Sequence, residues 1–348
     1  MHARMIMAAA LLEETWHEER VCGELDLSLT LTTGQAFRWH SLGGDDGITW
    51  VGAVGQYVFA LKSRDDSTLT YHTLHTPQDH THTPSHTLRD YFRLDTDLSE
   101  LCTSWANADP NFNSKVSQYK GVRLLRQDPL ENVISFICSS NNNIARISGM
   151  LNSLCENLGE PICCYGDHTI YGFPTLDSLC ADNMESTLRD LGFGYRSKYV
   201  AMAAKSIVEK GGVEWLLGLR EKPYAEVVTS LRTLSGVGPK VADCVAMMSC
   251  DKLEAVPIDT HVWSVAVRDY GLAKKNKSLT ASAYKEIGDH FRDLFGPMAG
   301  WAIAVLFVAD LDRSGRYKGE SIQSPKGSKG KRKRKDQQSL KSAKKRKT

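Results

Sequence analysis

The sequence predicts an α+β protein in which a small antiparallel sheet precedes a helical domain. Up to about residue 75, apolar residues alternate with polar ones or form β-branched and aromatic runs, as in strands. Beyond residue 117, apolar residues recur every three or four positions, which is the period of helices. With 348 residues, 41% of them hydrophobic, the chain can bury two cores.

Three stretches near the N-terminus are predicted to be strands. Leucine occupies every second position from Leu25 to Leu31, and a Thr-Thr-Gly break follows. Residues 48–61 and 67–74 are rich in aromatic and β-branched side chains. We interpret the region with histidines at 72, 75, 80, 82 and 86 as a polar surface loop rather than a metal cluster, because Thr, Pro, Gln and Asp surround them.

Helices are predicted from residue 128 onward. Asp128 can cap a helix that starts at Pro129, and Glu131 is placed as in a capping box. A second amphipathic helix covers residues 144–158 and ends at Gly159. The same periodicity predicts helices at 176–191, 197–210, 224–234, 240–250, 260–270, 283–295 and 300–309.

The charge of the chain is distributed unevenly. Residues 313–348 hold 15 Lys or Arg and two acidic side chains, whereas residues 1–312 hold 28 basic and 39 acidic ones. The basic clusters 331–335 and 344–347 are typical of a bipartite nuclear import signal, although they would also suit an arm that binds polyanions. We therefore expect a disordered tail and a nuclear protein, and a mitochondrial form stays open. Because the remainder is acidic, any DNA-binding face there must be local.

Neither a membrane span nor a metal site is expected. No uninterrupted apolar stretch approaches the roughly 18 residues of a membrane span, so no membrane association is predicted. The nine cysteines include no Cys-x2-Cys pair, so neither a zinc site nor an iron–sulfur cluster is expected. Their odd number and scattered positions favour reduced thiols.

A helix, a tight hairpin and a second helix are predicted between residues 227 and 248. The hairpin contains Gly236, Val237 and Gly238, and Lys240 and Cys244 lie one turn apart on the second helix. Glycines let the backbone approach a phosphate, and the free N–H groups at a helix start attract its negative charge. Such a hairpin can bind DNA without a basic surface, although an ordinary corner between helices has the same glycines.

A second motif follows the hairpin by about twenty residues. Here Pro257-Ile-Asp259-Thr-His261 places Asp259 as the N-cap of the next helix. A capping aspartate is common in proteins. The combination of this aspartate with a lysine at the start of the hairpin's second helix is what points to catalysis.

These motifs resemble the helix-hairpin-helix DNA glycosylase superfamily and, within it, the eukaryotic 8-oxoguanine DNA glycosylases. The resemblance rests on six blocks in the same order: Thr33-Gly-Gln-Ala-Phe-Arg-Trp39, Ser139-Ser-Asn-Asn-Asn-Ile-Ala-Arg146, Leu191-Gly-Phe-Gly-Tyr-Arg196, the hairpin with Val-Ala-Asp-Cys244, Val256-Pro-Ile-Asp-Thr-His261, and the Gly296-Pro and Gly300-Trp-Ala-Ile-Ala-Val-Leu-Phe307 segments. The resemblance extends over nearly the whole chain before the basic tail.

The resemblance implies a domain organisation and an activity. A flexible start at 1–15 would precede a TATA-binding-protein-like domain at 16–116, a helical glycosylase domain at 117–312 and the disordered tail at 313–348. The chain would act as a monomer on damaged double-stranded DNA, excising 8-oxoguanine opposite cytosine and then cleaving the strand. No cofactor would be required, although the hairpin backbone can hold a monovalent or calcium ion in this family.

The resemblance also implies roles for individual residues. Lys240 would attack the sugar C1′ and form a Schiff base that permits β-elimination, and Asp259 would stabilise the positively charged sugar. The flipped base would stack between Phe307 and Cys244, and the Gly34 carbonyl would accept the N7 hydrogen of oxidised guanine. The base-binding set is completed by Met248, Pro257 and Ile303.

The remaining roles concern the DNA around the flipped base. Asn141 would fill the gap in the stack, Arg146 and Arg196 would hydrogen-bond the orphaned cytosine, and Tyr195 would wedge beside it. Phosphates would contact His261 and the hairpin backbone of Gly236, Val237 and Gly238.

The sequence departs from the family at Ile303, where glutamine is usual and reads the pairing edge of the base. Isoleucine neither donates nor accepts, so contacts worth about 0.5–1.5 kcal/mol each are lost. We expect weaker discrimination of the base while the chemistry of Lys240 and Asp259 is retained.

Two other interpretations stay open at this level. A glycosylase of the same superfamily could act on an alkylated purine or an oxidised pyrimidine, but Lys240 disfavours the first and the lack of cysteines after Cys250 the second. A noncatalytic hairpin module that binds DNA through its basic tail would have no need of the Lys240 and Asp259 pair.

Overall fold

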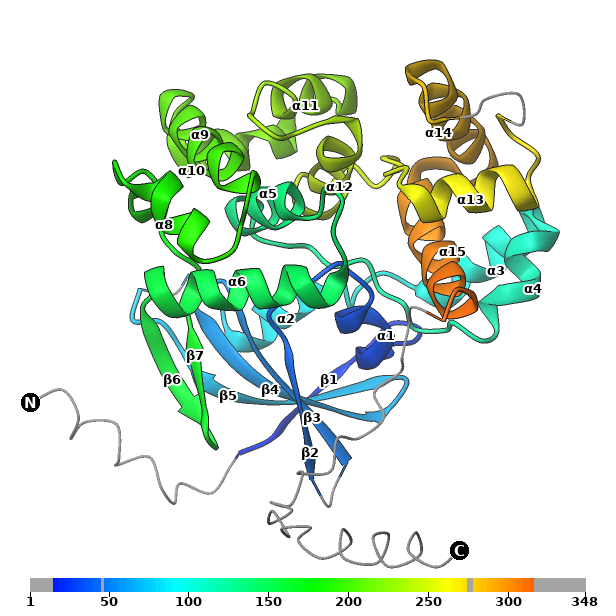
Figure 1. The fold of residues 1–348 in the computed structure, drawn as a ribbon. Coiled ribbons are helices and arrows are strands. Elements are labelled where there is room, and N and C mark those ends of the chain that lie inside the picture. Colours follow the sequence, from blue (N-terminus) through cyan, green and yellow to red (C-terminus); the bar gives the residue numbers. More distant parts are fainter. Residues whose placement is uncertain (1–14, 45–46, 80, 274–277, 316–348) are drawn as a thin grey trace, which may run out of the picture.

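The computed structural model describes residues 15–44, 47–79, 81–273 and 278–315. Most of the predicted flexible start and most of the predicted basic tail therefore lie outside the described residues. A twisted antiparallel sheet forms one side of the molecule, and helices form the rest (Figure 1). This arrangement confirms the α+β fold class.

The sheet has five strands in the order β1-β5-β4-β3-β2, each paired antiparallel with its neighbours. The predicted strand regions 48–61 and 67–74 are confirmed as parts of β3, β4 and β5. His72 and His75 lie on β5, so the prediction of a polar loop is wrong for these two positions. The strands are β1 (His17–Arg20), β2 (His40–Gly44), β3 (Gly47–Val54), β4 (Tyr57–Asp65) and β5 (Thr68–His75).

Other elements cover both faces of the sheet. Alternate residues of β4 point to opposite faces and are buried on each of them. Phe59 and Leu61 pack with Leu88 and Phe92 of α2 (Pro84–Phe92) in one fully buried cluster. On the other face, Val58 and its neighbours pack against a β-hairpin that follows α6 in the sequence. The hairpin consists of β6 (Pro161–Tyr165) and β7 (His168–Tyr171).

The strand predicted at Leu25–Leu31 is wrong, because residues Leu27–Thr32 form helix α1. Asp26 caps this helix by accepting a hydrogen bond from Leu29 N at 2.8 Å. Leu27, Thr30 and Leu31 are the buried residues, which is one face of a helical turn. The alternating leucines fit a strand equally well, and the local cap and the tertiary packing decide for the helix.

The helical layer begins before residue 117. Trp105 of α3 (Leu98–Ala108) and Phe112 of α4 (Pro110–Val116) pack edge-on against each other and contact Phe295 near the C-terminus. The sheet domain and this layer are joined by Arg123, which is fully buried and donates to the carbonyls of residues 22, 24, 93 and 96.

The helices after residue 128 agree with the sequence in most of their bounds. One prediction is wrong: residues 176–191 form two short helices, because Asp182 and Asn183 lie in a turn that such residues favour. The helices are α5 (Pro129–Cys138), α6 (Ile144–Leu158), α7 (Leu176–Leu179), α8 (Met184–Asp190), α9 (Arg196–Glu209), α10 (Gly212–Gly218), α11 (Tyr224–Leu231), α12 (Pro239–Ser249), α13 (Thr260–Asp269), α14 (Ala281–Phe295) and α15 (Ala299–Arg313).

The predicted cap of α5 is confirmed in part. Asp128 accepts from Glu131 N at 2.9 Å, as an N-cap should. The Glu131 carboxylate, however, does not complete a capping box, because it forms a two-pronged ion pair with Arg38, with distances of 2.8 and 2.7 Å. Arg38 also donates to the Tyr171 carbonyl at 2.9 Å, so this pair ties the sheet domain to α5 and to β7.

The stretch Ala281–Arg313 is long and apolar enough to cross a membrane, with 67% of its most apolar window buried. It is not one continuous helix, since Gly296 has φ +70° and separates α14 from α15. The two helices pack on each other, and Trp301, Ile303 and Leu306 lie in the main core. The stretch is therefore a core element of this fold.

Candidate active site

A cavity that opens to solvent lies where α5, α12, α13 and α15 meet the segment after α1. It brings together every residue that the sequence assigned to catalysis or base binding. Its wall is mostly apolar, and the amide of Gln35, one of its few polar side chains, is already used by the backbone at Arg123 and Leu125. The predicted residues that line it are Gly34, Lys240, Cys244, Met248, Pro257, Asp259, Ile303 and Phe307.

Lys240 reaches the cavity from the first turn of α12. Its Nζ donates to Ser139 Oγ at 3.2 Å and lies 4.8 Å from the centroid of the Phe136 ring. Both partners come from the C-terminal end of α5, where the helix dipole favours a cation. The structure thus holds the amine at the cavity wall through groups of a neighbouring helix.

Asp259 also lines the cavity, at the start of α13. Its Oδ1 accepts from the backbone N–H groups of His261 at 2.8 Å and Val262 at 2.9 Å, which confirms the predicted cap. Both capping bonds use the same oxygen, so Oδ2 is left for other partners. One carboxylate can therefore cap the helix and still present negative charge to the cavity.

Cys244 forms part of the cavity wall one turn after Lys240. Burial raises the pKa of its thiol to about 11, although the nearby Lys240 acts in the other direction. The thiol is therefore neutral at physiological pH and serves as an apolar, polarisable surface. This suits the predicted stacking role better than a nucleophilic one.

The neighbouring Asp243 joins the two motifs. Its buried carboxylate accepts from the hydroxyls of Tyr224 at 2.7 Å and Tyr284 at 2.5 Å, and burial raises its pKa to about 6 in spite of these bonds. The Tyr284 hydroxyl in turn accepts from Ile258 N at 3.3 Å. This chain of contacts fixes the helix that bears Lys240 relative to the segment that bears Asp259.

The hairpin between α11 and α12 has the predicted form. Gly236 has φ +80°, and a Cβ atom there would lie 2.8 Å from Tyr199 Cβ, so only glycine fits. Gly238 precedes α12, whose N-terminus has no side-chain cap. Its first backbone N–H groups are thus available to an anion, as a phosphate site requires.

Of the residues predicted to contact the DNA around the flipped base, Asn141, Tyr195 and Arg196 meet at the turn after α5. Asn141 and Arg146 are exposed, and Asn141 has a left-handed φ of +49°. Tyr195 is 51% exposed, and its ring lies under the Arg196 guanidinium at 4.4 Å. Arg196 donates to the carbonyls of Ser140 and Asn141.

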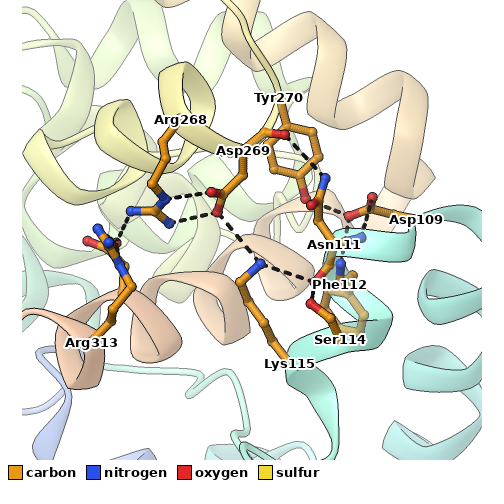
Figure 2. A network of polar contacts seen from close by, with 10 residues as sticks. Asp109, Asn111, Phe112, Ser114, Lys115, Arg268, Asp269, Tyr270 and Arg313 are labelled. Carbon is orange, nitrogen blue, oxygen red and sulfur yellow. Dashed lines mark hydrogen bonds and ion pairs between the residues drawn. The ribbon is translucent and has the colours of Figure 1, made fainter.

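His261 occupies the first turn of α13, where its Nδ1 is 2.8 Å from Asp310 Oδ2. Burial would raise the pKa of Asp310, but hydrogen bonds from Arg268, His261 and Arg313 outweigh it and lower this pKa. Arg268 also pairs with Asp269, which continues the network to Lys115 of α4 (Figure 2). The orientation of the histidine is thereby fixed from several elements.

Sequence reasoning missed the two residues in closest contact with Lys240. Phe136 lies on α5 and Ser139 is its C-cap, and both are off the apolar face formed by residues 130, 133, 134 and 137. The signal was present, because Phe136 is a large apolar residue off that face and every residue of α5 except Glu131 is buried. A helix that is buried on nearly all sides has more than one neighbour, and here one of them is the cavity.

Two family models match successive segments of the chain, and two relatives match most of its length. The family model of the 8-oxoguanine DNA glycosylase N-terminal domain matches residues 21–133, and that of the HhH-GPD superfamily of base excision DNA repair proteins matches residues 134–289. The N-glycosylase/DNA lyase of Arabidopsis thaliana is 38% identical over 83% of this chain and 78% of its own length. That of Saccharomyces cerevisiae is 36% identical, over 83% and 84%.

A solved structure extends the likeness to three dimensions. It is the 8-oxoguanine glycosylase/lyase of Clostridium acetobutylicum bound to double-stranded DNA with cytosine opposite 8-oxoguanine. The TM-score is 0.72 at 27% identity, over 86% of this chain and 98% of the other.

Proposed function

Because the chain belongs to the 8-oxoguanine DNA glycosylase family of helix-hairpin-helix base excision repair enzymes, we propose that it excises 8-oxoguanine opposite cytosine. The enzyme is a bifunctional DNA glycosylase and lyase. The observation that carries the choice of residues is the apolar cavity that Lys240 and Asp259 share.

The chemistry follows from these two side chains. The Lys240 amine forms a bond to the sugar C1′ while the bond from C1′ to the base breaks, and the base leaves with a proton. The departing base leaves positive charge on the sugar, which the Asp259 carboxylate stabilises. The C1′–O4′ bond then breaks, the ring oxygen takes a proton and a Schiff base forms between Lys240 and C1′. This Schiff base acidifies the 2′ hydrogen, whose loss expels the 3′ phosphate and cleaves the strand.

The cavity suits a flipped purine. Phe307 and Cys244 offer an aromatic face and a neutral thiol as the two stacking surfaces, and the Gly34 carbonyl is the proposed acceptor for the N7 hydrogen. Gly34 has φ +89°, and a Cβ atom at this position would lie 3.3 Å from Ile144 Cδ1. Glycine thus provides the backbone conformation that this edge of the cavity adopts.

Outside the cavity, DNA contacts are assigned to two groups of residues. Asn141, Arg146, Tyr195 and Arg196 form the proposed surface for the gap and the orphaned cytosine. The hairpin N–H groups and His261 are the proposed phosphate contacts, because both lie at helix N-termini. These contacts do not depend on net charge, which is consistent with the acidic composition of the folded part.

Ile303 gives the most direct test of the proposed substrate. Its side chain is 2% exposed and lines the cavity, so it offers the base no hydrogen bond. We expect the wild-type chain to release 8-oxoguanine opposite cytosine and Ile303→Gln to do so about three- to tenfold faster, because one hydrogen bond is regained. Single-turnover assays measure the excision rates of the wild type and of Ile303→Gln on duplexes that hold 8-oxoguanine or undamaged guanine.

The same assay separates the alternatives. Duplexes with an alkylated purine or an oxidised pyrimidine serve as the comparison substrates, and cleavage of a preformed abasic site serves as the control for the lyase step. Release of another lesion in preference to 8-oxoguanine would contradict the proposed substrate. Equal rates for wild type and Ile303→Gln would contradict the role assigned to this position.

We also propose that the hairpin backbone can hold a monovalent or calcium ion. Backbone carbonyl oxygens are ligands that such hard cations accept, and the described residues hold no group of three His, Cys, Asp or Glu side chains that could bind a metal. A backbone site would assist phosphate binding at the hairpin. The amine chemistry of this family needs no cofactor.

Nuclear localisation is likewise a proposal. The clusters 331–335 and 344–347 lie outside the described residues, and their composition supports import. A fluorescent protein fused to residues 313–348 should accumulate in the nucleus, and an even distribution between nucleus and cytoplasm would refute the assignment.

A further inference from the structure

A short turn after α5 touches both the proposed cytosine readers and the nucleophile. Ser140 and Asn141 accept hydrogen bonds from Arg196 through their carbonyl oxygens, and Ser139 accepts one from Lys240 Nζ at 3.2 Å. The three residues are consecutive, and the φ of +49° at Asn141 gives the turn its left-handed bend. Three consecutive residues thus contact both Arg196 and Lys240.

On the cytosine side, Arg196 is bonded to the protein rather than open to solvent. It donates to the carbonyls of Ser140 and Asn141, the latter at 3.1 Å, and Tyr195 donates to the same Ser140 carbonyl at 3.0 Å. Arg196 is only 3% exposed, and its Nε is buried without an acceptor. A buried guanidinium with an unused donor gains free energy when a new acceptor arrives.

On the lysine side, Ser139 is oriented to accept. Its hydroxyl donates to the Phe136 carbonyl at 2.8 Å, which leaves the oxygen lone pairs for the Lys240 amine. The amine also rests near the Phe136 ring, 4.8 Å from its centroid. To attack a sugar carbon, the amine has to leave both partners.

We propose that Ser139 is a positioning residue that makes Schiff-base formation depend on the base opposite the lesion. It restrains the Lys240 amine until the orphaned base draws Arg196 away from the turn. This inference rests on the proposed function of Lys240 and Arg196.

The pairing edges of the bases give the coupling its specificity. Cytosine presents two adjacent acceptors, N3 and O2, to a guanidinium, whereas adenine presents one acceptor beside a donor. Opposite cytosine, Arg196 releases the Ser140 and Asn141 carbonyls, the turn relaxes and Ser139 withdraws from Nζ. Opposite adenine, Arg196 keeps its carbonyl partners and the amine stays restrained.

The test measures Schiff-base formation apart from base excision. Full-length protein at saturating concentration is trapped with borohydride, in single turnover, on duplexes that carry a preformed abasic site opposite cytosine or adenine. Ser139→Ala removes the hydroxyl and Ser139→Thr retains it. The matched control Ser140→Ala changes the adjacent exposed side chain but keeps the carbonyl that Arg196 and Tyr195 use.

Wild-type protein is expected to react faster opposite cytosine. In Ser139→Ala the rate opposite adenine should rise about tenfold, which corresponds to the loss of one hydrogen bond to a cation, while the rate opposite cytosine should change less than about twofold. Ser139→Thr and Ser140→Ala should keep the wild-type ratio, and the melting temperatures of all variants establish that they fold.

Three results would overturn the inference. Equal slowing of both rates in Ser139→Ala would mean that Ser139 only orients the amine. An unchanged ratio in that variant would mean that the turn carries no coupling, and a ratio in Ser139→Thr like that of Ser139→Ala would exclude the hydroxyl. A wild-type chain that forms no adduct opposite either base would instead refute the lyase chemistry assigned to Lys240.

Discussion

Lys240→Gln is expected to abolish the borohydride-trapped adduct with DNA that holds 8-oxoguanine opposite cytosine. Excision should fall by at least about a thousandfold, because only water could then attack the sugar. Glutamine is nearly as long as lysine and can still donate to Ser139 Oγ, so the cavity wall stays intact. Electrophoresis of the trapped complex and single-turnover excision measure the two losses.

A matched control separates this result from a general loss of positive charge. Lys222 is an exposed lysine just before α11, outside the cavity, and Lys222→Gln should form the adduct at the wild-type rate. We expect Lys240→Gln to bind the damaged duplex without cleaving it. An adduct that persists in Lys240→Gln would assign the nucleophile to another amine.

Asp259→Asn should lower the excision rate about 10²- to 10³-fold while leaving the stability of the protein unchanged. Both capping hydrogen bonds of Asp259 go to Oδ1, and asparagine caps a helix as well as aspartate does. The substitution therefore removes the negative charge that stabilises the sugar cation and little else. Excision kinetics and a thermal melt of the same preparation test the two parts together.

The two other measurements on Asp259 define what would contradict its role. Asp259→Ala also removes the cap, so it should lose about 1 kcal/mol of stability in addition to activity. Adduct formation on a preformed abasic site requires no departing base, so it should suffer less than excision does in Asp259→Asn. Equal losses in the two assays would mean that Asp259 acts on the amine rather than on the sugar cation.

The sequence brought the proposed catalytic pair, Lys240 and Asp259, to notice because its signals are local. Gly236 and Gly238 mark the hairpin, and the one-turn spacing of Lys240 and Cys244 on an amphipathic helix places both on the cavity side. Asp259 was identified as a cap from its position before Thr260, and the structure confirms it. The DNA-facing residues followed from resemblance, and their individual roles remain predictions.

Other features depend on partners that are distant in the sequence. Glu131 pairs with Arg38, 93 positions away, rather than with the backbone of its own helix. Ser139 meets Lys240 across 101 positions, and neither helix by itself indicates that contact. Such pairs are decided by which helices pack together, which short-range periodicity does not encode.

The sequence by itself determined the helix periods, the caps and the hairpin, because each depends on residues within one or two turns of one another. It also determined that residues 313–348 carry the basic charge. Tertiary packing, together with the cap at Asp26, decided that Leu27–Thr32 is a helix, and tertiary structure alone decided that Lys240 rests on the end of α5. In both cases the local pattern allowed two conformations or several partners, and burial against the rest of the fold selected one.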